Sequence, residues 1–165
     1  MLKRLFLVII FGFVCGSLPV SAQEKPEEGQ GYVPVSKFDS KRDAEEDIRN
    51  AVAEARRTGK RILLDVGGDW CVWCRRLDSL FVENKDLAES LQRGFVVVKV
   101  NWSRENKNES VLSRYPRIPG YPHLFVLESD GKLLHSQDTG QLESGNHHDR
   151  DKVQAFLKKW APQGK

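Results

Sequence analysis

Cys71 and Cys74 stand two residues apart in the stretch DWCVWC, and a tryptophan precedes each cysteine. Thiols at this spacing can form a redox centre, supply half of a metal site, or close a short structural disulfide. A redox pair needs one cysteine that is a thiolate near neutral pH. It also needs a second thiol close enough to resolve the mixed disulfide that the first one forms.

The residues around the two cysteines predict a strand, a turn and a helix. Residues 61–66 form a short apolar run that suits a buried strand, and Gly67-Gly68 then turns the chain. Apolar residues continue at helical spacing at Leu77, Leu80 and Phe81. Cys71 is therefore expected at or just before a helix N-terminus, where free N–H groups and the helix dipole favour a thiolate. Cys74 is expected one turn inside the helix, shielded and protonated.

The remaining elements follow from periodicity and from turn residues. We expect helices over residues 44–55 with a stop at Gly59, over 86–92 with a stop at Gly94, over 109–115 for one or two turns, and around Val153, Phe156, Leu157 and Trp160. Strands are expected over 95–102, 123–128 and 132–138, the last two joined by a hairpin turn at 129–131. The order α-β-α-β-α-β-β-α predicts an α/β fold, with a central mixed β-sheet flanked by helices on both faces.

The first 22 residues have the composition of a secretory signal peptide. Lys3 and Arg4 supply the positive end, residues 5–15 the apolar core, and residues 20–22 (Val-Ser-Ala) the cleavage site. The alternative is a retained anchor, but the apolar run of 11 residues is short, since a span needs about 20. We expect cleavage near Ala22 and a location in the periplasm or outside the cell. Residues 23–38 are interpreted as a flexible leader and residues 39–162 as the domain.

Charge and cysteine count narrow the choice of function. The chain of 165 residues favours one domain, and cleavage leaves 24 basic and 23 acidic residues, a net charge of +1. Such a balance excludes a nucleic-acid binder. Cleavage also removes Cys15, so the mature protein keeps one adjacent pair of cysteines. A disulfide across so short a loop constrains little of the unfolded chain, which disfavours the structural interpretation.

Residues 39–160 resemble the thioredoxin family in several motifs that occur in the family's order. ILLDVGGDWCVWC is similar to its strand, loop and helix, and Asp65 lies six residues before Cys71. Lys99 and Gly120-Tyr121-Pro122 match further motifs. The stretch DWCV is also similar to the thioredoxin-like domains of periplasmic disulfide reductases, with Gly68 in place of an alanine.

The resemblance implies roles for individual residues. Cys71 would be the nucleophile and Cys74 the resolving thiol, with Asp65 buried beneath them as the base and Lys99 paired with Asp65. A cis bond before Pro122 would expose backbone groups to an extended substrate. The residues expected to contact substrate are Trp70, Trp73, Tyr121 and Pro122.

The chain also departs from the family pattern. Val72-Trp73 between the cysteines is neither the Gly-Pro of thioredoxins nor the Pro-His of strong oxidases, which leaves the redox potential open. Tyr121 stands where smaller residues are frequent, and His123 is interpreted as a strand residue.

Two other classes of function stay open. A zinc or copper site would need ligands beyond the two cysteines, and His147-His148 in a polar, glycine-containing stretch are better interpreted as an exposed loop. A thioredoxin-like binding or chaperone module without redox turnover is the other alternative. The favoured hypothesis is an exported, monomeric thiol-disulfide oxidoreductase that reduces or isomerises protein disulfides. It would need no cofactor or metal, and a membrane or periplasmic electron donor would regenerate it.

Overall fold

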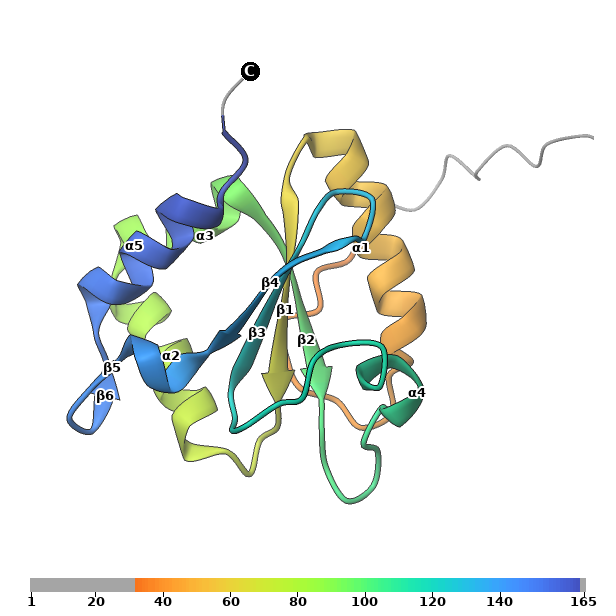
Figure 1. Cartoon of the computed structure of the whole chain (residues 1–165), viewed down its shortest axis with the longest axis horizontal. Coiled ribbons are helices and arrows are strands. Elements are labelled where there is room, and N and C mark those ends of the chain that lie inside the picture. The colour runs from red at the N-terminus through yellow and green to blue at the C-terminus, as the bar shows by residue number, and fades with distance from the viewer. Residues whose placement is uncertain (1–31, 164–165) are drawn as a thin grey trace, which may run out of the picture. The chain divides into compact units, whose positions relative to one another are not determined.

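The computed structural model describes residues 32–163, which form a mixed α/β domain (Figure 1). Its helices are α1 (Ala44–Thr58), α2 (Val72–Glu83), α3 (Lys85–Gly94), α4 (Glu109–Leu112), η1 (Thr139–Leu142, a 3₁₀ turn) and α5 (Arg150–Trp160). Its strands are β1 (Arg61–Gly67), β2 (Phe95–Asn101), β3 (His123–Leu127), β4 (Leu133–Asp138), β5 (Glu143–Ser144) and β6 (His147–His148). Among these residues, no helix has the length and apolar character that crossing a membrane requires.

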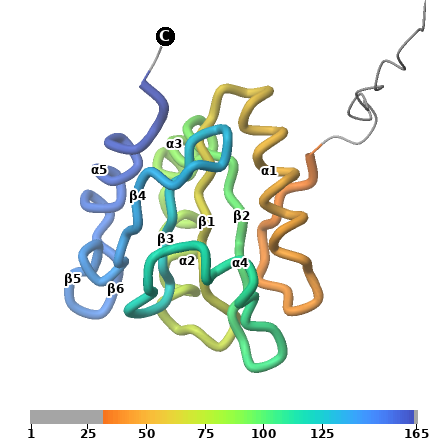
Figure 2. The backbone as a smooth tube through the Cα atoms, turned by 45° about the vertical axis from the view of Figure 1, so that its right-hand side comes forward, coloured from red at the N-terminus to blue at the C-terminus, as the bar shows by residue number. Residues whose placement is uncertain are grey.

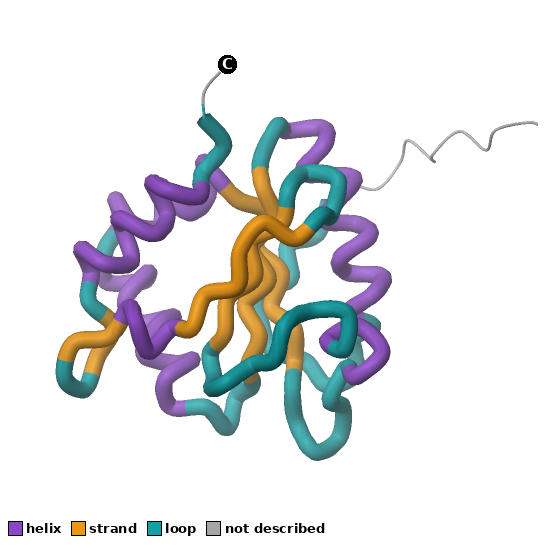
Figure 3. Tube along the Cα trace, in the orientation of Figure 1, coloured by secondary structure: helices purple, strands orange, loops and turns teal. Residues whose placement is uncertain are grey.

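The four longer strands form one sheet in the order β2-β1-β3-β4 (Figure 3). β1 and β2 run parallel, while β3 is antiparallel to β1 and β4 is antiparallel to β3. The parallel register places Asp65 opposite Lys99, and the antiparallel register places Val66 opposite His123. The mixed sheet that the sequence predicts is confirmed.

Helices cover both faces of this sheet. Figures 1 and 2 show α1 on one side of the sheet and α5 on the other, and Figure 1 places α4 on the side of α1, and α2 and α3 on the side of α5. Side chains alternate along β1, so Ile62, Leu64 and Val66 join the core beneath α1. Leu63 belongs to the opposite core, with Leu77 and Phe156 among others. The same alternation directs Asp65 to the face that α2 covers.

Part of the expected leader belongs to the folded domain, which corrects the boundary at residue 38. Val35 and Phe38 are buried, and Val35 forms an isolated parallel bridge with Val98 of β2. The backbone N–H of Lys99 donates to the Val35 carbonyl at 3.1 Å. The sequence predicted a flexible leader because residues 23–36 are mostly polar and contain prolines. The few apolar side chains among them gave no signal that they pack against the sheet. Residues 23–31 of the leader, and the expected signal peptide at 1–22, lie outside the described residues.

A second correction concerns the segment between β4 and α5. The sequence predicted an exposed loop at His147-His148, but these residues form β6 and pair with β5 in a small hairpin. Gly145 has a φ of 61° in the hairpin turn, a conformation that favours glycine. His147 is exposed as expected, whereas His148 is 1% exposed. The short strands hold too few residues to show an alternating pattern.

Candidate redox site

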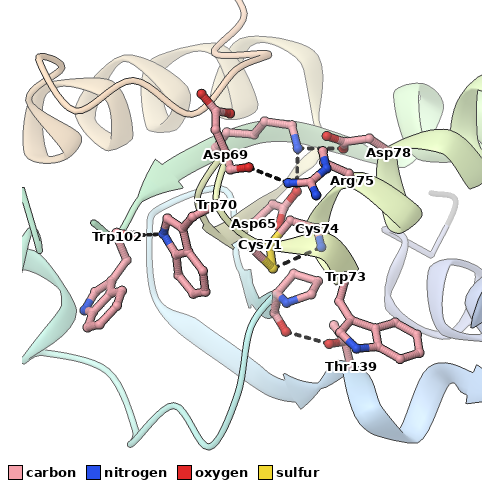
Figure 4. The surroundings of a disulfide bond; sticks show 12 residues. Asp65, Asp69, Trp70, Cys71, Trp73, Cys74, Arg75, Asp78, Trp102 and Thr139 are labelled. Carbon is pink, nitrogen blue, oxygen red and sulfur yellow. Dashed lines mark hydrogen bonds and ion pairs between the residues drawn. A yellow bond between two sulfur atoms is a disulfide. The ribbon is translucent and has the colours of Figure 1, made fainter. Parts of the chain in front are cut away.

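Cys71 and Cys74 form a disulfide at the start of α2, with their Cα atoms 5.2 Å apart (Figure 4). Cys71 is the N-cap residue, and its sulfur accepts a hydrogen bond from the backbone N–H of Cys74 at 3.1 Å. Both residues are buried, Cys71 at 4% and Cys74 at 1% exposure. The sulfur of Cys71 therefore lies at the positive end of the helix dipole, which would stabilise a thiolate after reduction.

Two glycines let the chain pass from β1 into this helix. A Cβ atom at Gly67 would collide with the sulfur of Cys74, and one at Gly68 would collide with the indole of Trp70. The Gly68 carbonyl accepts the backbone N–H of Cys71 at 2.9 Å, which closes the turn. The close approach of strand, turn and sulfur requires residues without side chains at these two positions.

A buried ion pair lies on the sheet beneath α2. Lys99 Nζ is 2.8 Å from a carboxylate oxygen of Asp65 and 2.6 Å from one of Asp78. Asp65 and Lys99 are almost fully buried, whereas the side chain of Asp78 is 45% exposed. The ring of Phe38 covers Lys99, with Nζ 4.3 Å from the ring centroid. Lys99 therefore connects a buried carboxyl to one that reaches solvent.

The environment of Asp65 makes its carboxylate a stronger base than that of an ordinary aspartate. Burial raises the pKa of Asp65, and the charge and hydrogen bond of Lys99 only partly offset this. Burial alone would lower the pKa of Lys99, but Asp65 and Asp78 outweigh it and raise that pKa. The second carboxylate oxygen of Asp65 has no hydrogen-bond partner within residues 32–163. Asp65 is thus able to take up a proton.

A pocket of about 810 Å³ gives this ion pair a route to solvent. Apolar side chains of α2, α3, α5 and β2 form much of its wall together with residues 34–37, and Asp65, Asp78 and Lys99 also line it. Space for water next to a buried carboxyl allows protons to reach and leave it. The sequence indicated Asp65 and Lys99 but missed Asp78, which lies four residues after Cys74 and so on the same face of α2.

Aromatic side chains line one side of the disulfide (Figure 4). Trp70 is 52% exposed, and its indole N–H donates to the Trp102 carbonyl at 2.7 Å. The rings of Trp102 and Tyr121 stack at 5.0 Å, and Trp70 meets Tyr121 edge to face at 5.6 Å. The Tyr121–Pro122 bond is cis, and the Pro122 carbonyl accepts the hydroxyl of Thr139 at 2.5 Å. Sequence reasoning missed Trp102 and Thr139, whose contacts join distant segments.

Trp73 lies on the other side of the disulfide (Figure 4). The guanidinium of Arg76 is 4.5 Å from the centre of the Trp73 ring, and His148 contacts that ring edge to face at 5.4 Å. Trp70 and Trp73 thus flank the cysteines.

The four histidines lie in β3, β4 and β6. His123 is buried in β3, where burial lowers its pKa, and its Nε2 lies 2.8 Å from the Ser136 hydroxyl. Across residues 32–163, no group of three or more His, Cys, Asp or Glu side chains is arranged to hold a metal ion.

A family model described as thioredoxin-like matches residues 43–129. The chain belongs to the thioredoxin-like family. The matched segment contains the cysteine pair, Asp65, Lys99 and the cis bond before Pro122.

Curated relatives are named for disulfide chemistry. The thiol:disulfide interchange protein DsbD of Pseudomonas fluorescens is 28% identical over 116 residues, which cover 69% of this chain and 18% of the relative. The disulfide bond reductase DsbH of Chlamydia pneumoniae is 24% identical over 80 residues, 44% of this chain and 48% of the relative. The chain thus spans less than a fifth of that DsbD and about half of that DsbH.

A solved structure matches most of the described domain. The disulphide isomerase of Xylella fastidiosa Temecula1 superposes with a TM-score of 0.65 at 28% identity, over 74% of this chain and 94% of that chain. The DsbD C-terminal domain of Neisseria meningitidis, at 16% identity and a TM-score of 0.52, shows the shared fold alone.

Proposed function

We propose that the chain is a thiol-disulfide oxidoreductase that reduces or isomerises disulfides in other proteins. The observation that carries this proposal is the placement of Cys71 at the N-cap of α2, with Cys74 one turn later and a buried carboxyl beneath them. This arrangement provides a nucleophile, a resolving thiol and a base. The names of the relatives agree with this chemistry.

The reduced protein begins the reaction. The Cys71 thiolate attacks one sulfur of a substrate disulfide, so that a mixed disulfide forms and the other substrate sulfur leaves as a thiolate, which water protonates. Cys74 then gives its proton to Asp65 and attacks the sulfur of Cys71. The second substrate sulfur leaves, takes up a proton and becomes a thiol. Two electrons pass from the dithiol of the protein to the substrate, and the Cys71–Cys74 disulfide results.

The surface around the cysteines suits an extended, partly apolar segment of a substrate protein. Trp70 and Val72 expose apolar surface beside the disulfide, at 52% and 47%. Tyr121, joined to Pro122 by the cis bond, packs against the cysteines, and Trp73 borders the site on the other side (Figure 4). Aromatic walls supply contact area, while the backbone next to Pro122 can pair with an extended chain.

The place of this reaction follows from the N-terminal sequence. We infer that residues 1–22 are removed as a signal peptide and that the domain acts in the periplasm or outside the cell as a monomer. Each reductive turnover leaves the protein oxidised, so a membrane or periplasmic electron donor must reduce it again. The reaction itself uses only side chains of the protein.

Separate cysteine variants test the proposal. We expect Cys71→Ser to abolish the reduction of a protein disulfide such as that of insulin, because no nucleophile remains. Cys74→Ser should instead accumulate mixed disulfides, because the attack proceeds and the resolution does not. Non-reducing electrophoresis and mass spectrometry distinguish these results. Faster alkylation of Cys74 than of Cys71 at neutral pH in the reduced protein would reverse the assignment.

A further inference from the structure

His148 of β6 lies against the first turn of α2, far from the cysteines in sequence (Figure 1). Its Nε2 atom is 3.2 Å from the backbone carbonyl oxygen of Trp73. A carbonyl oxygen only accepts hydrogen bonds, so Nε2 carries the proton. The other ring nitrogen, Nδ1, is buried without a partner among residues 32–163, as a neutral ring protonated on Nε2 would leave it. The contact with the Trp73 indole fixes the orientation of the ring.

The peptide group that His148 contacts also serves the sulfur of Cys71. The carbonyl of Trp73 and the N–H of Cys74 belong to one planar trans unit and point in opposite directions. That N–H donates to the sulfur of Cys71 at 3.1 Å. A hydrogen bond received by the carbonyl polarises the peptide group and strengthens the bond that its N–H donates. The three groups therefore form a chain from the imidazole to the sulfur.

We propose that His148 is a positioning residue that acts through the Trp73–Cys74 peptide group to favour the Cys71 thiolate in the reduced protein. The inference rests on the proposed function and adds a residue to its nucleophile. The step is a deprotonation, in which the Cys71 thiol gives its proton to water and the remaining thiolate accepts from the Cys74 N–H. No other bond forms or breaks.

The neutral imidazole is sufficient for this role. Burial lowers the pKa of His148, although the Trp73 carbonyl, Glu143 and Asp65 oppose that shift and Arg76 adds to it. These charged groups face the ring from β5, β1 and α2, and His147 and Asp149 are its neighbours in the chain. Because the donor is Nε2–H, the hydrogen bond persists at neutral pH without a charge on the ring.

Four substitutions separate the hydrogen bond from simple packing. His148→Leu fills the space but removes the donor. His148→Gln places an amide N–H near the position of Nε2, whereas the shorter His148→Asn does not reach it. His147→Gln, at the exposed neighbour, is the matched control. The pH dependence of the iodoacetamide reaction of Cys71 is measured on each reduced protein, and circular dichroism reports its folding.

We expect His148→Leu and His148→Asn to raise the midpoint of the Cys71 titration by about half a pH unit, a roughly threefold loss of rate below the midpoint. His148→Gln and His147→Gln should keep the original midpoint. Equal midpoints in all five proteins, or equal shifts in the Gln and Leu variants, would overturn the role of the hydrogen bond. If His148→Leu does not fold, the comparison of Gln with Asn decides alone, and equal midpoints there overturn the inference.

The titration does not depend on turnover, so the two hypotheses fail in different ways. If Cys71 titrates in the wild-type protein and the variants have the same midpoint, only the role of His148 is refuted. If Cys71 of the wild-type protein shows no thiolate reactivity at neutral or mildly alkaline pH, the proposed function is refuted. The inference about His148 is then refuted as well.

Discussion

Asp65 has a raised pKa, a carboxylate oxygen without a hydrogen-bond partner among residues 32–163, and a place beneath the cysteines (Figure 4). Asp65→Asn keeps the shape of the side chain and removes the base. We expect first attack by Cys71 to be largely intact and release of the mixed disulfide to slow by roughly 10- to 100-fold. Rapid-quench trapping of the mixed disulfide measures both steps. Unchanged turnover, in a variant that melts like the wild type, would make Asp65 a structural residue.

Asp78 influences the pKa of Asp65, the carboxyl that acts as the base. Its negative charge raises the pKa of Asp65, and it shares the ammonium group of Lys99. With Asp78→Asn, the pKa of Asp65 should fall, so the base is ionised at lower pH. Because resolution needs the ionised form, we expect its rate to begin rising at lower pH than in the wild type. The control is Glu83→Gln, on the same helix. An unshifted profile for Asp78→Asn would contradict the coupling.

The residues of the site differ in how far the sequence reveals them. Cys71 and Cys74 are recognisable from the two residues between them, and Asp65 is recognisable as a charged residue in an apolar run. Asp78 was detectable from its position four residues after Cys74, but a charge on a helix usually faces solvent. His148 gives no such signal, because its contact with Trp73 joins residues 75 positions apart. Contacts of that kind depend on the whole fold.

At the scale of elements, the segment before α1 completes the site. Phe38 is 8% exposed and forms a small cluster with both cysteines, next to Gly67 and Lys99. Phe38→Ala would leave a cavity over the ion pair, and we expect the free energy of unfolding to fall by about 3 kcal/mol. Urea denaturation measures this loss. Val33→Ala, at a position 73% exposed, should change stability little, and equal midpoints in both variants would show that the segment is not part of the folded core.

Sequence patterns predicted the long elements better than the short ones. Gly59 ends α1 with a φ of 71°, and Cys71 begins α2, where glycine and apolar spacing gave clear signals. β5 and β6 contain two residues each, and their polar side chains are typical of a loop. The bridge at Val35 lay in a segment dominated by charge and proline. Pairing with an existing strand, and not local preference, orders these segments.

At the scale of the whole molecule, the sheet order explains why the site forms at this end. β1 lies between parallel β2 and antiparallel β3, so the end of β1, the end of β2 and the start of β3 meet. The cysteine turn follows β1, Trp102 follows β2, and the Tyr121–Pro122 bond precedes β3, so these three segments lie together although they are distant in sequence. The order of predicted elements implied a mixed sheet but gave no strand order, which depends on how the elements pack.

The direction of electron flow is a property of the whole protein, and we expect it to favour reduction or isomerisation. A strong oxidant has a very acidic nucleophilic thiol, which stabilises its reduced form. Val72 and Trp73 bring no charge to the sulfur of Cys71, and the charge of Lys99 is shared by Asp65 and Asp78. The start of α2 and the Cys74 N–H favour the thiolate of Cys71 after reduction, but no cationic side chain in the part of the chain that the structure describes is in contact with that sulfur to make the thiol as acidic as that of a strong oxidant.

We therefore expect the redox potential of the Cys71–Cys74 pair to lie below about −200 mV, on the reducing side of the disulfide isomerases. A dithiol whose nucleophilic thiol is not strongly acidic gives up its electrons readily, provided that an exported donor reduces the protein again. Equilibration with glutathione buffers, followed by thiol trapping, measures the potential. The Cys71→Ser protein, which has no disulfide to form, supplies the baseline. A potential near about −120 mV, together with a Cys71 thiol that titrates around pH 4, would instead make the protein an oxidase.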